Sequence, residues 1–154
     1  MAISQRQVRE RIQAILEAMP GVNFVITDDN CPLSPEQLPA VLVLAAGRAT
    51  RERRSRDIIR VTRRWIIVAY LTHVCNTSPE EQRAAIDAAE DLIEVIPDYF
   101  SSLDRLSLNR QLLHGVIEVA EMTDGGLITT ARSEGKKTVV YNAALYELAV
   151  TTAR

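Results

Sequence analysis

The chain has 154 residues, 47% of them hydrophobic, and a formal net charge of −2, which is typical of one globular domain with a substantial core. Its longest apolar run, 66–71, is far shorter than the roughly 18 residues that a membrane span needs. The N-terminus is charged within ten residues and lacks the pattern of a secretory signal, so we expect a single domain over 1–154, placed in a cytoplasm without a membrane partner.

The chain begins with the pattern of an amphipathic helix. Ser4 and Gln7 occupy the two positions of a capping box, which predicts the start of the helix at Ser4. Apolar residues then recur at three-to-four spacing, which predicts one buried stripe: Val8, Ile12, Ile15, Leu16 and Met19. Pro20-Gly21 ends the helix, and the composition of 22–27 predicts a short strand.

Two turn signals separate this strand from the next. Residues 28–30 offer three oxygen side chains, but no glycine turn or distant bidentate glutamate accompanies them, so a turn cap is favoured over a cation site. Ser34-Pro35-Glu36-Gln37 repeats the capping-box pattern with proline in the first helical position, and Pro39 ends it. A short helical turn is therefore expected before residue 40.

Residues 40–74 predict two strands joined by an arginine-rich turn, with the tip of the hairpin at about 47–60. Both alternating sets of side chains from Trp65 to Leu71 are largely apolar, which indicates a central strand covered on both faces. From Ile58 to Arg64, in contrast, arginines take both sides. A strand that begins charged and ends apolar is expected to leave the protein body at its charged end.

The charge of the chain is segregated. The segment 48–64 contains eight arginines against Glu52 and Asp57, a formal charge of +6, so the remainder carries −8. Such a patch suits nucleic acid or an acidic surface on a copy of the same protein, and the charge alone does not choose between them.

The next element is the main helix. Ser78-Pro79 provides a cap serine and a proline in the first helical position, and the apolar stripe that follows is Ala85, Ala89, Leu92, Ile93 and Ile96. Pro97 is expected to end or kink the helix, because proline lacks an amide donor. A further short helix is predicted from a final set of apolar residues: Tyr99, Phe100, Leu103 and Leu106.

The C-terminal part predicts strands around one loop. Residues 116–122 alternate roughly and indicate a strand, whereas 123–137 contain three glycines and little periodicity, which predicts a flexible loop that orders only on a partner. Residues 138–141 and 145–152 predict a closing strand or pair. The element order indicates an α+β fold, with a mixed, mainly antiparallel β-sheet, a long protruding hairpin and flanking α-helices.

We find no sequence signal for catalysis. The phosphate-binding glycine loops and the Gly-x-Ser-x-Gly nucleophile pattern are absent from the sequence. His73 and Cys75 share a face if 73–75 is extended, but two ligands are too few for a metal site, and the lone cysteines, Cys31 and Cys75, are interpreted as inert thiols. The carboxylates of 80–94 are interpreted as a solvated helix face. We therefore predict a non-enzyme without metal or cofactor.

The candidate site is the arginine tip, interpreted as an interface with another subunit or partner: Arg48, Arg51, Arg53, Arg54, Arg56 and Arg60. Arginine suits this role because its planar fork pairs bidentately with carboxylates. Backbone contact with DNA through Arg51, Arg53, Arg54 and Arg56 is the alternative, since no aromatic residue between 48 and 64 is available for base stacking. A solvated loop with no partner is the third interpretation.

The order and character of the elements resemble those of the tail terminator, or tail completion, proteins of tailed bacteriophages. The resemblance covers nearly the whole chain and rests on five stretches: the leading helix through Met19-Pro20-Gly21, the hairpin entry at 38–43, the strand at 64–68, the alanine-rich helix at 80–96 and the closing strand at 141–146. The charged hairpin and the segment after Met122 depart from the family.

The resemblance implies a structural virion protein, assembled in the host cytoplasm. It implies a homo-oligomeric ring, typically a hexamer, that caps the tail tube, stops tube polymerisation and presents a surface to the head connector. Its partners would be other copies of itself, the tail tube protein and the connector or neck protein, with passing contact to DNA in the channel. Another head-to-tail connector or neck component is the closest alternative role.

Overall fold

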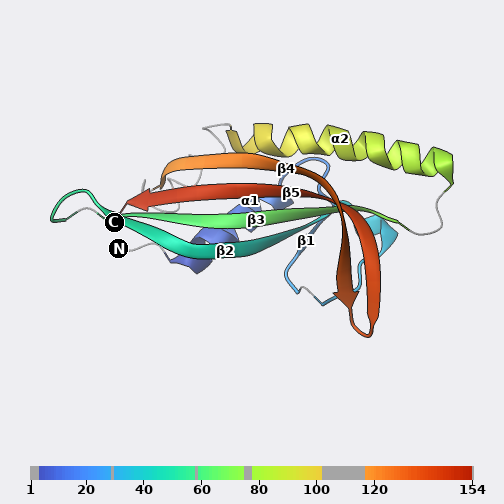
Figure 1. Ribbon diagram of the computed structural model, residues 1–154, viewed down its shortest axis with the longest axis horizontal. Coiled ribbons are helices and arrows are strands. Elements are labelled where there is room, and N and C mark those ends of the chain that lie inside the picture. The colour runs from blue at the N-terminus through green and yellow to red at the C-terminus, as the bar shows by residue number, and fades with distance from the viewer. Residues whose placement is uncertain (1–3, 29, 58, 75–77, 102–116, 154) are drawn as a thin grey trace.

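The computed structural model describes residues 4–28, 30–57, 59–74, 78–101 and 117–153, which form an α+β domain (Figure 1). Its elements are α1 (Gln5–Glu17), β1 (Phe24–Ile26), the 3-10 turn η1 (Pro35–Gln37), β2 (Ala40–Arg53), β3 (Ile59–His73), α2 (Pro79–Ser101), β4 (Ile117–Glu134) and β5 (Lys137–Ala153). The five strands make one sheet in the order β1-β2-β3-β5-β4. Among these described strands only β1 and β2 pair in parallel, so the predicted mixed, mainly antiparallel sheet is confirmed.

Helix α1 begins as its capping box predicts. The Ser4 hydroxyl accepts a hydrogen bond from the Gln7 amide at 3.2 Å, and the Gln7 side chain accepts one from the Ser4 amide at 2.8 Å. These bonds satisfy two donors that a helix start would otherwise leave without partners. All five residues of the predicted apolar stripe are buried, which confirms the face on which α1 lies.

Strand β3 is the centre of the sheet, with β2 on one side and β5 on the other. Trp65, Ile67 and Ala69 point to one face and are at most 1% exposed. Val68 and Tyr70 point to the other face and are also buried. The prediction of a strand covered on both sides is therefore confirmed.

The two faces of the sheet are covered differently. Both helices pack on the Trp65 face, where Leu16 of α1 and Ile96 of α2 join the core around Trp65. The Val68 face is covered by the segment between β1 and β2, through Leu33, and by the distal part of the β4–β5 hairpin, through Tyr141. In Figure 1 that hairpin turns away from the sheet at the end opposite the β2–β3 tip.

Helix α2 runs through Pro97 to Ser101, so of the two predicted effects of Pro97, an end or a kink, the end is wrong. Leu92 and fully buried Ile96 anchor the helix on the sheet, and this packing outweighs the one backbone hydrogen bond that proline removes. Tyr99 and Phe100 belong to the same helix, so they do not begin a new one. The rest of the predicted short helix, Leu103 and Leu106, lies outside the described residues.

The predicted loop at 123–137 is also wrong: its residues up to Glu134 belong to β4 and pair with β5. Glycine content misled the prediction, because a register irregularity between Asp124 and Gly126 is absorbed within the strand. Gly135, with φ of 64°, then makes a tight turn that needs the left-handed conformation favoured by glycine. The segment is therefore half of a long hairpin, and the predicted closing strands are one strand, β5.

A buried polar network fixes the distal β4–β5 hairpin to the rest of the domain. Arg132 and Glu134 are 4% and 7% exposed and form an ion pair at 3.2 Å. The Glu134 carboxylate accepts hydrogen bonds from the Leu33 amide and from the Tyr141 hydroxyl, while the Arg132 guanidinium donates to the Cys31 carbonyl. The network therefore ties the loop before β2 to the hairpin.

The turn at 28–30 and the histidine of β3 have local roles in this region. The Asp28 carboxylate accepts a hydrogen bond from the Asn30 amide at 3.1 Å, which confirms the predicted turn cap. His73 Nε2 lies 3.2 Å from the Tyr141 hydroxyl, at the margin of the same network. Cys75, the other residue weighed as a metal ligand, lies outside the described residues.

The network makes a prediction about stability. Arg132→Met should lower the free energy of unfolding by about 3–5 kcal/mol, because it leaves the buried Glu134 carboxylate without its cation. The matched control is Arg64→Met, which breaks the exposed Arg64–Glu147 pair and should cost about 0–1 kcal/mol. Urea denaturation of both variants measures the difference, and equal costs would contradict a buried, charged network.

A second prediction concerns alkaline pH. Burial, and then the hydrogen bond to Glu134, raise the pKa of Tyr141 above its ordinary value of 10.0, so the folded protein retains a proton that the unfolded chain loses. Stability should therefore fall as pH rises above 10.0, and the slope should be steeper than in Tyr141→Phe by up to about 1.4 kcal/mol per pH unit. Denaturation of both proteins above pH 10.0 measures how the free energy of unfolding changes with pH. Equal slopes in the parent and in Tyr141→Phe would show that Tyr141 ionises equally in the folded and unfolded states.

Candidate interaction surface

The charged surface is built on the β2–β3 hairpin, whose β3 strand pairs with β5 as far as Arg60 and whose tip projects past the end of the sheet at the left of Figure 1. Its strands pair up to Arg53 and Ile59, so the ribbon is held by its own backbone ladder. The register shifts between the Ala46–Arg64 and Thr50–Thr62 pairs. In this interval β2 has two more residues than β3. Gly47, with φ of 69°, lies in this irregularity and supplies the left-handed conformation there.

The register places the arginines of the hairpin on two different faces. Residues paired directly across an antiparallel ladder point to the same side, and Arg51 pairs with Val61 while Arg53 pairs with Ile59. Because side chains alternate along β3, Arg63 shares that side as well. These three residues, Arg51, Arg53 and Arg63, form what we call the arginine face, on the side of the sheet that carries the helices.

The opposite side of the ribbon has mixed charge. Glu52 pairs with Arg60 in the ladder, and Arg64 forms an ion pair of 2.9 Å with Glu147 of β5. Thr62 and Thr151 hydrogen bond across the same side at 2.9 Å. This side therefore neutralises part of its own charge.

The electrostatics of the arginine face are those of crowded like charges. Burial, followed by the nearby charge of Arg51, lowers the pKa of the Arg63 guanidinium, which nevertheless stays protonated as arginine does in proteins. Arg51 and Arg53 are exposed, and within the described residues neither has an acidic group within 4.0 Å. Such a surface gains free energy by meeting an anionic partner.

A second charged surface lies on α2. This helix has seven acidic residues and one basic residue, Arg83, a formal charge of −6 that equals in size the +6 of the segment 48–64. At 3.6 residues per turn, five exposed acids fall within about 60° of the helix circumference, opposite Leu92 and Ile96. These five, Glu80, Asp87, Asp91, Glu94 and Asp98, form what we call the acidic stripe.

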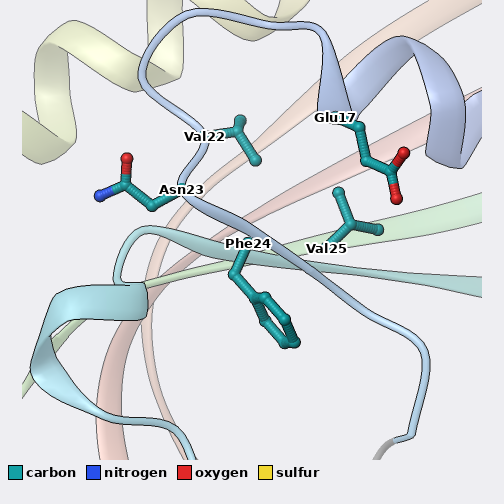
Figure 2. Close-up of a pocket in the computed structure, with 5 residues that line it drawn as sticks. All are labelled: Glu17, Val22, Asn23, Phe24 and Val25. Atoms are coloured by element: carbon teal, nitrogen blue, oxygen red, sulfur yellow. The ribbon is translucent and has the colours of Figure 1, made fainter.

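A shallow depression near β1 is a different kind of feature. It has a volume of about 250 Å³ and is lined by Glu17, Val22, Asn23, Phe24 and Val25. Figure 2 shows the Glu17 carboxylate and the Asn23 amide on opposite sides of the apolar side chains. The Asn23 amide already donates to the Leu38 carbonyl at 2.7 Å. The depression therefore presents one titratable group and no converging pair.

Among the described residues, no three histidine, cysteine, aspartate or glutamate side chains gather where an ion would bind. In that part of the chain, neither helix has the length and apolar content needed to cross a bilayer.

The structure distributes the six predicted interface residues over four places. Arg51 and Arg53 lie together on the arginine face, and Arg54 and Arg56 follow in the turn, where Arg54 pairs with Glu52 at 3.3 Å. Arg48 lies in the register irregularity, and half-buried Arg60 is on the mixed side. The sequence did not predict Arg63 as a member of the face. The two extra residues of β2 shift the pairing of β2 with β3, so the residues of β3 that lie opposite Arg51 and Arg53 could not be predicted.

In comparisons with known proteins, no protein-family model matches the chain, and no curated protein matches it significantly.

The exposure of the arginine face makes a prediction about the isolated protein. The double variant Arg51→Ala/Arg53→Ala should change the free energy of unfolding by no more than about 0.5 kcal/mol per site, because these side chains contact little of their own chain. Trp65→Ala, at the root of the same hairpin, should cost about 3–5 kcal/mol. Urea denaturation compares the two. A loss in the arginine variant comparable to that of Trp65→Ala would mean that the tip packs on its own body.

Proposed function

We propose that this protein is a structural subunit of a tailed bacteriophage particle, a tail terminator that assembles as a ring, a hexamer, on the last ring of the tail tube. In this role it stops tube polymerisation and offers the surface to which the head connector binds. The role is non-enzymatic and needs no cofactor or metal. It places the protein in the virion, at the tail or neck, after assembly in the host cytoplasm.

The observation that carries the proposal is the shape and charge of the β2–β3 hairpin. A cationic ribbon rooted in a sheet buried on both sides is rigid enough to engage a neighbouring subunit. The chain also holds an acidic surface on a different element, so one surface of a subunit suits a different surface of the next. Heterologous contacts of this kind close into rings when the rotation between subunits permits. The resemblance in element order supports the same class.

The closest alternative to a tail terminator is another neck or connector component of the same particle. Both roles need a ring and a head-to-tail position, and they differ in the neighbour that the ring contacts. Binding to the end of preformed tail tubes favours the terminator, whereas binding only to connector rings favours the neck component.

Assembly on tail tubes tests the proposal. When the purified chain is added to polymerising tail tube protein of the same particle, electron microscopy should show a ring at one tube end and shorter tubes as its concentration rises. Arg51→Glu/Arg53→Glu should weaken this capping, while Lys136→Glu/Lys137→Glu, the same charge change at the exposed turn of the other hairpin, should not. A chain that associates neither with itself, nor with tubes, nor with connectors would refute the proposal.

Contact with DNA is a second candidate function, favoured by the exposed arginines of the tip. It predicts that affinity for duplex DNA falls steeply with added salt and weakens in the variant Arg51→Ala/Arg53→Ala/Arg54→Ala/Arg56→Ala. The absence of binding at low salt would eliminate it.

A further inference from the structure

The arginine face and the acidic stripe are complementary but separated within one chain. The backbone ladder holds the ribbon extended, since β2 and β3 pair to Arg53–Ile59 and β3 and β5 pair to Arg60–Ala153. In Figure 1 the hairpin tip extends past one end of the sheet, while α2 starts at the other end and lies along β4. The tip therefore cannot reach the acidic stripe of its own chain without melting this ladder.

The spacing of the two surfaces matches. Arg51 and Arg53 are two residues apart on one side of a strand, a separation of about 6.6 Å. Asp87, Asp91 and Glu94 follow each other at four and three residues on one side of a helix, where neighbouring Cβ atoms are about 5–6 Å apart. Neighbouring arginines of the face can therefore engage neighbouring carboxylates of the stripe at the same time.

The chemistry of the contact is favourable on both sides. Arginine binds a carboxylate through two parallel hydrogen bonds, and its weakly hydrated guanidinium suits a partly buried interface. Val95, which is 42% exposed, lies beside the stripe and gives the aliphatic stems of arginine an apolar surface. The stripe extends over about 27 Å from Glu80 to Asp98, which is long enough for the tip to contact several of its acids.

We propose that the arginine face of one copy docks on the acidic stripe of α2 of the next copy, and that this is the repeating contact of the assembly. The inference deepens the proposed function and rests on it, because it names the receiving surface and the partner, a second copy of this chain. Each copy has one ribbon and one stripe, so every copy both gives and receives one contact. The contact is electrostatic, and added salt should weaken it because the Debye length is about 8 Å at physiological ionic strength.

A charge-swap experiment tests the inference. The ribbon variant is Arg51→Glu/Arg53→Glu, and the helix variant is Asp87→Lys/Asp91→Lys/Glu94→Lys. Each should reduce self-association by on the order of 100-fold or more, because like charges then face each other. An equimolar mixture should restore association, since every contact between the two variants pairs opposite charges. The assembly should then alternate the variants, and native mass spectrometry should find them in equal number.

Matched controls carry the same charge changes elsewhere. Lys136→Glu/Lys137→Glu matches the ribbon variant, and a triple variant of exposed glutamates outside α2 matches the helix variant: Glu10→Lys, Glu17→Lys and Glu36→Lys. Both controls should associate as the parent does, by sedimentation velocity or by ring formation on tube ends. If the helix variant unfolds, which circular dichroism detects, Asp87→Asn/Asp91→Asn/Glu94→Gln replaces it and should weaken association by at least about tenfold.

The outcomes separate the inference from the proposed function. Rings that form normally in the helix variant, or a mixture that fails to restore association, would overturn the inference and leave a ring with a different contact. A ribbon variant that loses duplex DNA affinity but associates normally would also overturn it, and would assign the arginines to nucleic acid. A parent chain that associates with neither itself, nor tubes, nor connectors would overturn both.

Discussion

The burial of β3 on both faces is the constraint on which the rest of the structure depends. Trp65, Ile67 and Ala69 fill one core, and Val68 and Tyr70 fill the other. A slip of one residue against β2 or β5 would exchange the two sets, so the register is fixed by packing. The same ladder continues without a break in β3 into the charged half of the strand. The core therefore decides which side of the sheet each arginine of β3 occupies, although none of those arginines belongs to the core.

The two hairpins of the domain are stabilised in different ways. The distal β4–β5 hairpin is held by buried polar contacts, in which the Glu134 carboxylate connects the Leu33 amide, Tyr141 and Arg132. A buried ion pair adds little net stability, but one that loses a partner is costly, so this network favours a single docked arrangement. The β2–β3 tip, in contrast, is held by its backbone ladder and presents exposed charges.

The sequence predicted correctly those elements whose buried residues recur at a regular spacing. It failed for elements in which the buried residues show no regular spacing. The stripe of α1 and the two-sided core of β3 were predicted residue by residue, because each buried side chain repeats at the spacing of its element. β4 was mistaken for a loop from 123 onward, because Leu127 and Ala131 on its outer side are exposed and its glycines resemble a turn. The arginine face was only partly predicted, since the irregularity at Gly47 sets the partner of each arginine and leaves no trace in the periodicity.

Charge separation connects the fold to the proposed role. A ribbon that cannot fold back and a helix whose outward side is acidic together favour contact between copies over contact within one. Photo-crosslinking from a probe at exposed Ser55, between the two strands, in assemblies mixed from isotopically light and heavy copies tests this most directly. Crosslinks to α2 that join a light copy to a heavy copy are the predicted result. Crosslinks confined to single copies would contradict the account.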